Sequence, residues 1–256
     1  MNADGMGGGL MADKRVALVT GASRGIGAAV ARRLAADGLA VVVNYVTGQA
    51  RAEAVVREIV AEGGHGVAIG ADVSDPADAA ALFEAGQAVF GGLDVIVNNA
   101  GVMQPGLVSL ADTSDELYER LVSINLGGTF NMLRLAATRL RDNGRIVNFS
   151  SSVVGLRPAG YAVYAATKAA VEAMTAVFAK EMGPRGIAVT AVAPGPVGTE
   201  LFLTGKTPEM VERIAAATPL GRLGTPEDVA GVVSFLVGGD GGWINGAVIR
   251  ANGGMV

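Results

Sequence analysis

The chain of 256 residues has no cysteine and one histidine, His65. The lack of cysteine excludes a disulfide framework and any metal site built on thiolates. A His-based catalytic triad or a cluster of several histidines would depend on His65 alone, which lies in a glycine-rich stretch typical of a solvated loop. We therefore expect no metal site in this protein.

Basic clusters, long apolar runs and a signal peptide are also missing. The formal net charge is −4 and no block of Lys and Arg occurs, which argues against nucleic-acid binding. No uninterrupted apolar run reaches the ~18 residues that a membrane span needs. Residues 1–13 carry glycines but no basic or long apolar segment, so we interpret them as a disordered leader. The expected location is the cytoplasm, with no nucleic-acid or membrane partner.

Half of the residues are hydrophobic, which is enough for a large core. Short Val/Ile-rich runs alternate with Ala-rich stretches of helical period. Such runs predict strands at residues 16–20, 40–45, 66–70, 93–98, 145–150, 187–192 and 247–250. Helices are predicted over 25–37, 49–62, 114–141, 161–182 and 226–237, with another starting at 74–76. The alternation predicts an α/β fold: one doubly wound domain, residues 14–256, with a parallel sheet covered by helices on both faces.

A glycine-rich turn at residues 20–27 follows the first predicted strand and opens the first predicted helix. Glycine lets the main chain approach a ligand closely, and the amides at a helix N-terminus attract a pyrophosphate. The spacing is Gly-x-x-x-Gly-x-Gly, not the Gly-x-Gly-x-x-Gly of other dinucleotide folds. We predict a dinucleotide site that includes Gly21, Ser23, Arg24, Gly25, Ile26 and Gly27.

The residues after the second predicted strand favour NADP(H) over NAD(H). NAD-binding folds usually place an acidic residue about 20 positions beyond the glycines, on the ribose hydroxyls. This chain has Asn44 and Tyr45 there, and no carboxylate to repel a 2′-phosphate. Arg24 could pair with that phosphate, the alternative being a solvated loop cation.

Further candidates follow other predicted strands at their carboxyl ends, where ligands bind in open α/β sheets. Asp72 and Val73 follow the third strand, and the Asp72 carboxylate either accepts a hydrogen bond from an adenine amino group or caps the next helix. The fourth strand leads into Asn99, Ala100 and Gly101, a segment suited both to a strand-end turn and to bordering the cofactor.

Tyr164 and Lys168 lie four residues apart and therefore share one face of the predicted helix 161–182. A nearby ammonium favours the phenolate and lowers the pKa of the tyrosine, which suits a general acid–base group. Ser151 and Ser152 follow the fifth strand, where a hydroxyl could hydrogen-bond a carbonyl oxygen as charge develops. Asn125 lies inside a predicted helix, where asparagine is unfavourable. That position indicates a bound water, a local bend or a buried, satisfied amide.

In combination these motifs resemble those of the short-chain dehydrogenase/reductase family over nearly all of residues 14–256. The resemblance rests on the glycine turn, on residues 98–101, on Asn125, a strand-end serine, Tyr164 and Lys168, and on Pro194-Gly195 with Thr199 after it. It implies a seven-stranded Rossmann-type sheet and usually a homotetramer. It also implies hydride transfer between NADP(H) and a ketone or secondary alcohol, similar to the 3-oxoacyl-[acyl-carrier-protein] reductases.

The resemblance implies a role for each matching residue. Tyr164 would protonate the alkoxide, Lys168 would lower its pKa and hold the nicotinamide ribose, and Asn125 would anchor a water. Ser151 or Ser152 would hydrogen-bond the carbonyl oxygen: counting back from Tyr164 favours Ser151, and the Ser-x-x-Gly pattern favours Ser152. The nicotinamide side of the cofactor would contact Pro194, Gly195, Val197 and Thr199.

Residues 195–219 are rich in Gly, Pro and Thr, and we predict a mobile flap over the substrate. Its apolar residues indicate a partly hydrophobic substrate, or simply pack the flap down. Two alternatives to the reductase remain: an NAD-linked sugar or polyol dehydrogenase, and a non-catalytic NADP-binding redox sensor.

Overall fold

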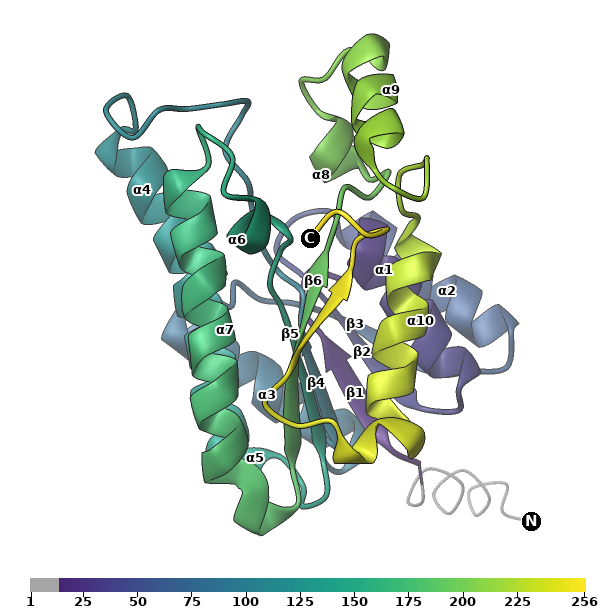
Figure 1. Cartoon of the computed structure of the whole chain (residues 1–256). Helices are drawn as coiled ribbons and strands as arrows, with labels where there is room; N and C mark the ends of the chain where they lie inside the picture. Colours follow the sequence, from purple (N-terminus) through teal and green to yellow (C-terminus); the bar gives the residue numbers. More distant parts are fainter. Residues whose placement is uncertain (1–13) are drawn as a thin grey trace, which may run out of the picture.

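The computed structural model describes residues 14–256, and the predicted leader, residues 1–13, lies outside the described residues. Seven parallel strands form one sheet in the order β3-β2-β1-β4-β5-β6-β7 (Figure 1). The strands are β1 (Val16–Val19), β2 (Ala40–Tyr45), β3 (His65–Gly70), β4 (Val95–Asn98), β5 (Arg145–Phe149), β6 (Ala188–Pro194) and β7 (Val248–Ala251). The predicted seven-stranded parallel sheet is confirmed. Its order reverses at β1 and β4, the place where such sheets bind ligands.

Helices cover both faces of the sheet (Figure 1). One face carries α1 (Gly25–Ala36), α2 (Gln49–Ala61) and α10 (Pro226–Val237), and the other carries α3 (Pro76–Phe90), α5 (Thr129–Arg139) and α7 (Ala162–Met182). Strand β1 supplies both cores by alternation, because Ala17 and Val19 pack on the first face while Val16 and Leu18 pack on the second. This double burial explains why the strands are apolar throughout.

The predicted start of the helix after β3 is confirmed at Asp75, with Pro76 in the first turn. The Asp75 carboxylate accepts hydrogen bonds from the backbone amides of Ala77 and Asp78. A side-chain oxygen at this position satisfies donors that the helix itself leaves unpaired, and such a cap contributes about 1 kcal/mol.

The predicted continuous helix 114–141 is wrong in its middle. Helix α4 (Asp115–Leu121) runs into a π-helix, η1 (Val122–Gly128), before α5 begins. The π-turn carries Asn125, whose side chain reaches the backbone of Val102. The widened turn therefore gives Asn125 the place outside a regular helix that its low helix propensity indicated.

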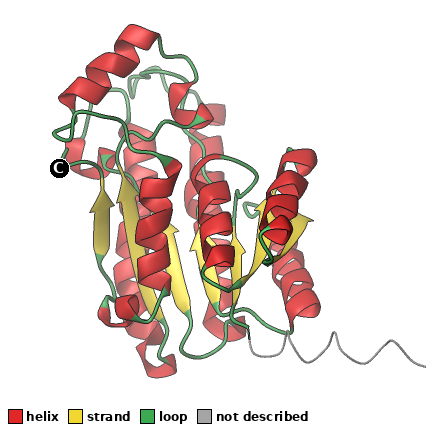
Figure 2. Ribbon diagram, turned by 90° about the vertical axis from the view of Figure 1, so that its right-hand side faces the viewer, coloured by secondary structure: helices red, strands yellow, loops and turns green. Residues whose placement is uncertain are grey.

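The flap predicted over residues 195–219 contains two helices that the prediction missed, α8 (Glu200–Leu203) and α9 (Pro208–Ala217). Each starts at a threonine whose hydroxyl accepts a backbone hydrogen bond, Thr199 for α8 and Thr207 for α9. Both helices stand beyond the carboxyl ends of the strands (Figures 1 and 2).

The segment Ala162–Arg185, which includes α7, is long and apolar enough to cross a membrane by length and composition alone. A third of its most apolar window, 33%, is buried against the rest of the protein. Because α7 packs along β5 and β6 and buries Lys168 and Thr175, we interpret it as a core helix of the α/β fold.

Candidate active site

The glycine turn joins β1 to α1 and adopts the backbone that its composition predicts. Gly21 and Gly25 have φ values of +62° and +55°, in the left-handed region that favours glycine. Gly27 is tight for another reason: a Cβ atom there would lie 2.5 Å from both the Gly21 carbonyl oxygen and the Asn99 side-chain nitrogen. Gly21 and Gly27 therefore have no room for a side chain, and the turn lies at the carboxyl end of β1.

Two asparagine side chains brace this turn, and neither had been predicted to do so. Asn99 Nδ2 donates to the carbonyl oxygens of Thr20 and Gly21, at 2.9 and 3.0 Å. The Asn44 side chain accepts from the Gly21 amide at 3.2 Å and donates to the Ala71 carbonyl at 3.0 Å. The Asn44 side chain therefore helps to hold the turn, and its predicted contact with the cofactor stays a prediction.

Asp72 lies at the entry to α3, and its predicted hydrogen bond to an adenine amino group stays a prediction. Its carboxylate accepts hydrogen bonds from the Ser74 amide and hydroxyl, at 2.9 and 2.7 Å. Asp72 thus orders the entry to α3, although Asp75 provides the cap. Val73 is buried beneath this loop, and the ring of Tyr45 packs on Gly70 at the end of β3.

The predicted acid–base pair lies together at the same edge of the sheet. Lys168 Nζ is 5.9 Å from the centre of the Tyr164 ring and donates to the Phe149 carbonyl at 2.8 Å. Gly101, at the end of β4, closes the site, because a Cβ there would lie 3.1 Å from Asn125 Oδ1 and 3.5 Å from Lys168 Nζ. Residues from the loop after β4, from η1 and from α7 therefore lie close together at this edge.

Asn125 is fully buried, with both ends of its amide engaged. Oδ1 accepts from the Val102 amide at 2.8 Å, and Nδ2 donates to the Val102 carbonyl at 3.0 Å. Of the three predicted alternatives, the local bend and the satisfied amide both describe this residue. Its effect is to fix the segment after β4 against α7.

The pKa of Tyr164 differs in direction from the sequence-based expectation. Burial raises the pKa of the phenol and outweighs the nearby Ser151 hydroxyl, which lowers it. Burial also lowers the pKa of Lys168 to about 8. Since desolvation disfavours the charged form of each group, the lysine alone does not make the tyrosine acidic.

Ser151 and Ser152 have different surroundings. Ser152 is buried, and its hydroxyl donates to the Ala193 carbonyl at 3.3 Å and accepts from Asn252 Nδ2 at 3.0 Å. Ser151 is half-buried beside Tyr164. This geometry favours Ser151 as the hydroxyl available to a substrate, and gives Ser152 a structural place.

The segment after β6 completes the rim of the site. Gly195 lies against the backbone of Asn252, where a Cβ would come within 2.8 Å. Val197 is buried and bridges to Gly224, and Pro194 ends β6. Thr199 lies next to the glycine turn, because a Cβ on Gly25 would be 3.4 Å from its methyl group.

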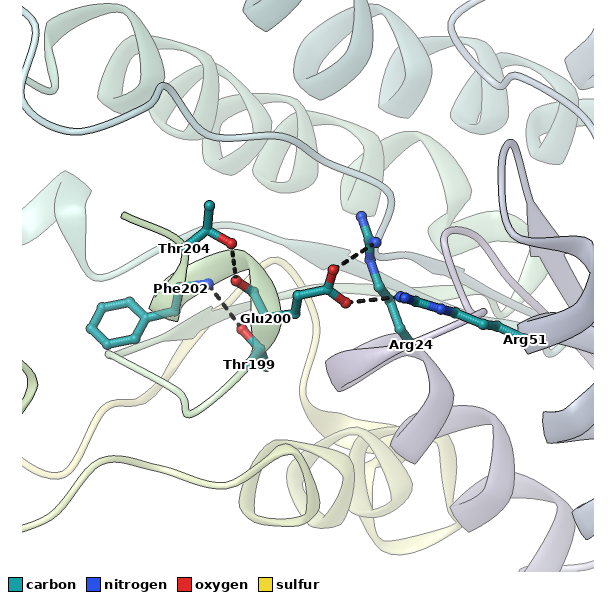
Figure 3. A network of polar contacts seen from close by, with 6 residues as sticks. All are labelled: Arg24, Arg51, Thr199, Glu200, Phe202 and Thr204. Atoms are coloured by element: carbon teal, nitrogen blue, oxygen red, sulfur yellow. Dashed lines mark hydrogen bonds and ion pairs between the residues drawn. The ribbon is translucent and has the colours of Figure 1, made fainter. Parts of the chain in front are cut away.

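Sequence reasoning missed two charged residues beside the turn, Arg51 and Glu200. Arg24 Nη1 lies 3.5 Å from one carboxylate oxygen of Glu200, and Arg51 Nη1 donates to the other at 2.8 Å (Figure 3). Arg51 is in the first turn of α2, and Glu200 begins α8. No local motif signals this contact, because the partners are 149 and 176 positions apart. Within residues 14–256, no three His, Asp or Glu side chains gather as a metal site.

Comparisons with known proteins identify a family and similar chains. A family model described as enoyl-(acyl carrier protein) reductase matches residues 21–256. An NADPH-dependent aldehyde reductase-like protein of Arabidopsis thaliana is 42% identical, over 94% of each chain. A versicolorin reductase of Emericella nidulans is 39% identical over 94% of this chain and 96% of its own.

Solved structures give the same result. A short chain dehydrogenase from Burkholderia cenocepacia, in complex with NADP, is 39% identical with a TM-score of 0.88, over 94% of this chain and 97% of that one. The fold and these relatives define an oxidoreductase acting on carbonyl or alcohol groups. More specifically, the chain belongs to the short-chain dehydrogenase/reductase family.

Proposed function

We propose that the protein is an NADP(H)-dependent reductase of aldehydes or ketones that also works in reverse on the corresponding alcohols. The observation that carries the proposal is the position of Tyr164 and Lys168, beside Gly101 and at the same sheet edge as the glycine turn. A proton donor and a dinucleotide-binding turn at one edge are the two parts that hydride transfer to a carbonyl requires.

The residues present fit NADP(H). No side chain caps the amides at the start of α1, and Arg24 and Arg51 place two guanidinium groups beside the glycine turn. When bound, the cofactor supplies the hydride. Relatives named as NADPH-dependent and a similar protein solved with NADP support NADP(H) rather than NAD(H).

Each site residue then has a separate task. Tyr164, whose pKa is raised by burial, is protonated at neutral pH and donates its proton to the developing alkoxide. Ser151 hydrogen-bonds the carbonyl oxygen and stabilises the charge that builds there. Lys168, held by the Phe149 carbonyl, carries positive charge toward the cofactor ribose and the phenol. Asn125 holds the segment after β4 in place against this cluster.

A substrate with an apolar part suits the flap. Leu201, Leu203 and Met210 in α8 and α9 are exposed in the described structure, between 39% and 47%, so they do not pack the flap down. Relatives named as aldehyde and versicolorin reductases support an aldehyde or another carbonyl compound as the substrate class. A 3-oxoacyl thioester belongs to the same test panel.

The decisive experiment is Tyr164→Phe with NADPH and a panel of aldehydes and ketones. Removing the only proposed proton donor should lower kcat by at least about a hundredfold, because general acid catalysis contributes that much or more. NADPH affinity should stay within a few-fold, since the fold is retained. A variant that still turns over at the wild-type rate would remove Tyr164 from this role. A wild-type protein that binds NADPH but reduces nothing would favour the redox sensor.

We also infer that the protein assembles as a homotetramer. The outer face of α7 exposes a row of small apolar residues, Ala162, Ala166, Ala169, Ala173 and Val177. Beside it, Leu110, Tyr118 and Leu126 contribute to a mostly apolar groove of about 460 Å³. Exposed apolar faces of this kind favour contact between copies. Light scattering should give four times the chain mass, and Ala173→Arg should reduce it.

A further inference from the structure

The ion-pair cluster of Arg24, Arg51 and Glu200 joins the cofactor side of the protein to the flap. The two arginines come from the glycine turn and from α2, whereas Glu200 comes from α8, and Figure 3 shows its carboxylate lying between them. All three side chains are about half exposed, at 54%, 56% and 57%. Water and ligands therefore have access to the cluster.

The backbone around Glu200 holds its carboxylate at this place. The Thr199 hydroxyl accepts from the Phe202 amide at 3.3 Å, and the Thr204 hydroxyl donates to the Glu200 carbonyl at 2.7 Å. Thr199 also lies against Gly25. The first turn of α8 thus packs beside the glycine turn, and the Glu200 side chain is directed at Arg24 of that turn and Arg51 of α2.

The chemistry of the contact is that of a phosphate site. A carboxylate and a phosphate offer the same oxygen acceptors to guanidinium groups. Neither α1 nor α2 has an acidic residue in its first turn. Within residues 14–256, Glu200 is the carboxylate that pairs with either arginine, and it reaches them from another part of the chain.

We propose that the Glu200 carboxylate occupies the place of the cofactor 2′-phosphate on Arg24 and Arg51, and that NADP(H) binding displaces it and releases α8. This inference rests on the proposed NADP(H) function and extends it, because it assigns Arg51 to selection of the phosphate and makes Glu200 its competitor. NAD(H) has no 2′-phosphate, so its binding leaves the ion pairs of Glu200 intact.

The competition has a reciprocal consequence. The ion pairs of Glu200 with Arg24 and Arg51 weaken the binding of a 2′-phosphate by some factor. Binding of the phosphate weakens these ion pairs by the same factor. Exposed ion pairs are individually weak, so we expect the two together to change affinity about threefold to tenfold. The effect decreases as salt screens the charges.

The test measures binding by titration calorimetry at low salt, with NADPH, NADH, 2′,5′-ADP and 5′-AMP. Glu200→Gln should bind NADPH and 2′,5′-ADP about threefold to tenfold more tightly, with NADH and 5′-AMP changed less than twofold. Glu84→Gln is the matched control. It removes one exposed, ion-paired carboxylate on the other face of the sheet and should leave all four affinities unchanged.

The Arg51 variants complete the design. Arg51→Gln should weaken NADPH and 2′,5′-ADP about tenfold and NADH less than twofold, because one charged hydrogen bond to the phosphate is lost. In the Glu200→Gln, Arg51→Gln double variant, the tightening due to Glu200→Gln should shrink, since the two residues act on one site.

The results distinguish failure of the Glu200 competition from failure of the proposed NADPH-dependent reductase function. If Glu200→Gln binds 2′,5′-ADP like the wild type, or more weakly, the competition is refuted while the NADPH reductase stands. Equal tightening of NADH and NADPH also refutes it, because the phosphate is then not the cause. If the wild type binds neither dinucleotide, the proposed function fails first.

Discussion

Replacing Gly27 with alanine adds one methyl group at the tightest point of the glycine turn. The added Cβ would lie 2.5 Å from the Gly21 carbonyl oxygen, 2.5 Å from Asn99 Nδ2 and 3.0 Å from Ala22 Cα. The Asn99 amide could swing away, but it would give up its hydrogen bonds to Thr20 and Gly21. The Gly21 oxygen belongs to the main chain, so the turn itself must also move.

The cost follows from these contacts. Two lost hydrogen bonds cost about 1 kcal/mol each and overpacking costs about 1–3 kcal/mol, whereas alanine in a helix gains about 1 kcal/mol over glycine. The net loss is about 2–4 kcal/mol, which lowers the melting temperature of a chain this size by roughly 5–15 °C. NADPH affinity should fall more than about tenfold, because the displaced turn no longer fits the pyrophosphate.

The matched control is Gly231→Ala in α10. This glycine is also helical, but a Cβ there would meet nothing within 4 Å. The control should be as stable as the wild type or gain up to about 1 kcal/mol. Urea unfolding and NADPH titration on both variants provide the measurement. A Gly27→Ala protein within about 1 kcal/mol of the wild type, binding NADPH within twofold, would refute the close approach described here.

Two further predictions concern the chemistry. Ser151→Ala should lower kcat about a hundredfold with little change in unfolding free energy. Ser152→Ala should instead destabilise the protein by about 1–3 kcal/mol, because Asn252 loses its buried acceptor. Kinetics and urea unfolding measure both effects, and the reverse pattern would contradict the assignment. Burial lowers the pKa of Lys168 to about 8 from 10.5, so this lysine loses its charge as the pH rises past about 8. Reductive kcat/KM should therefore fall above about pH 8, while Tyr164 stays protonated, and a profile flat to about pH 10 would contradict this role.

Much of the fold was readable in the sequence because its signals are local. Apolar runs buried on both faces indicate parallel strands. In β1, alternate residues pack into the cores on the two faces of the sheet. The glycine turn was equally readable, because positive φ at Gly21 and Gly25 restricts those positions to glycine. Four-residue spacing placed Tyr164 and Lys168 on one face without further information.

What the sequence did not reveal depends on contacts between distant segments. The side chains of Asn44 and Asn99 turn toward the backbone of the glycine turn, and their residue type alone does not distinguish that from a ligand contact. The direction of the Tyr164 pKa depends on how deeply the phenol is buried. Glu200 meets Arg51 across 149 positions, and only the folded flap brings them together.

The π-helix η1 determines which way the side chains of α5 face relative to those of α4. A π-turn amounts to one residue inserted into an α-helix, and one residue corresponds to about 100° of rotation. Asn125 can therefore look toward Val102 while Met132 and Ala136, downstream, still face the sheet. Deleting a single residue between 122 and 128 would restore a regular α-helix and leave Met132 and Ala136 on the sheet, but it would turn Asn125 away from Val102. The extra residue of the π-helix therefore serves the position of Asn125 and not the packing of α5.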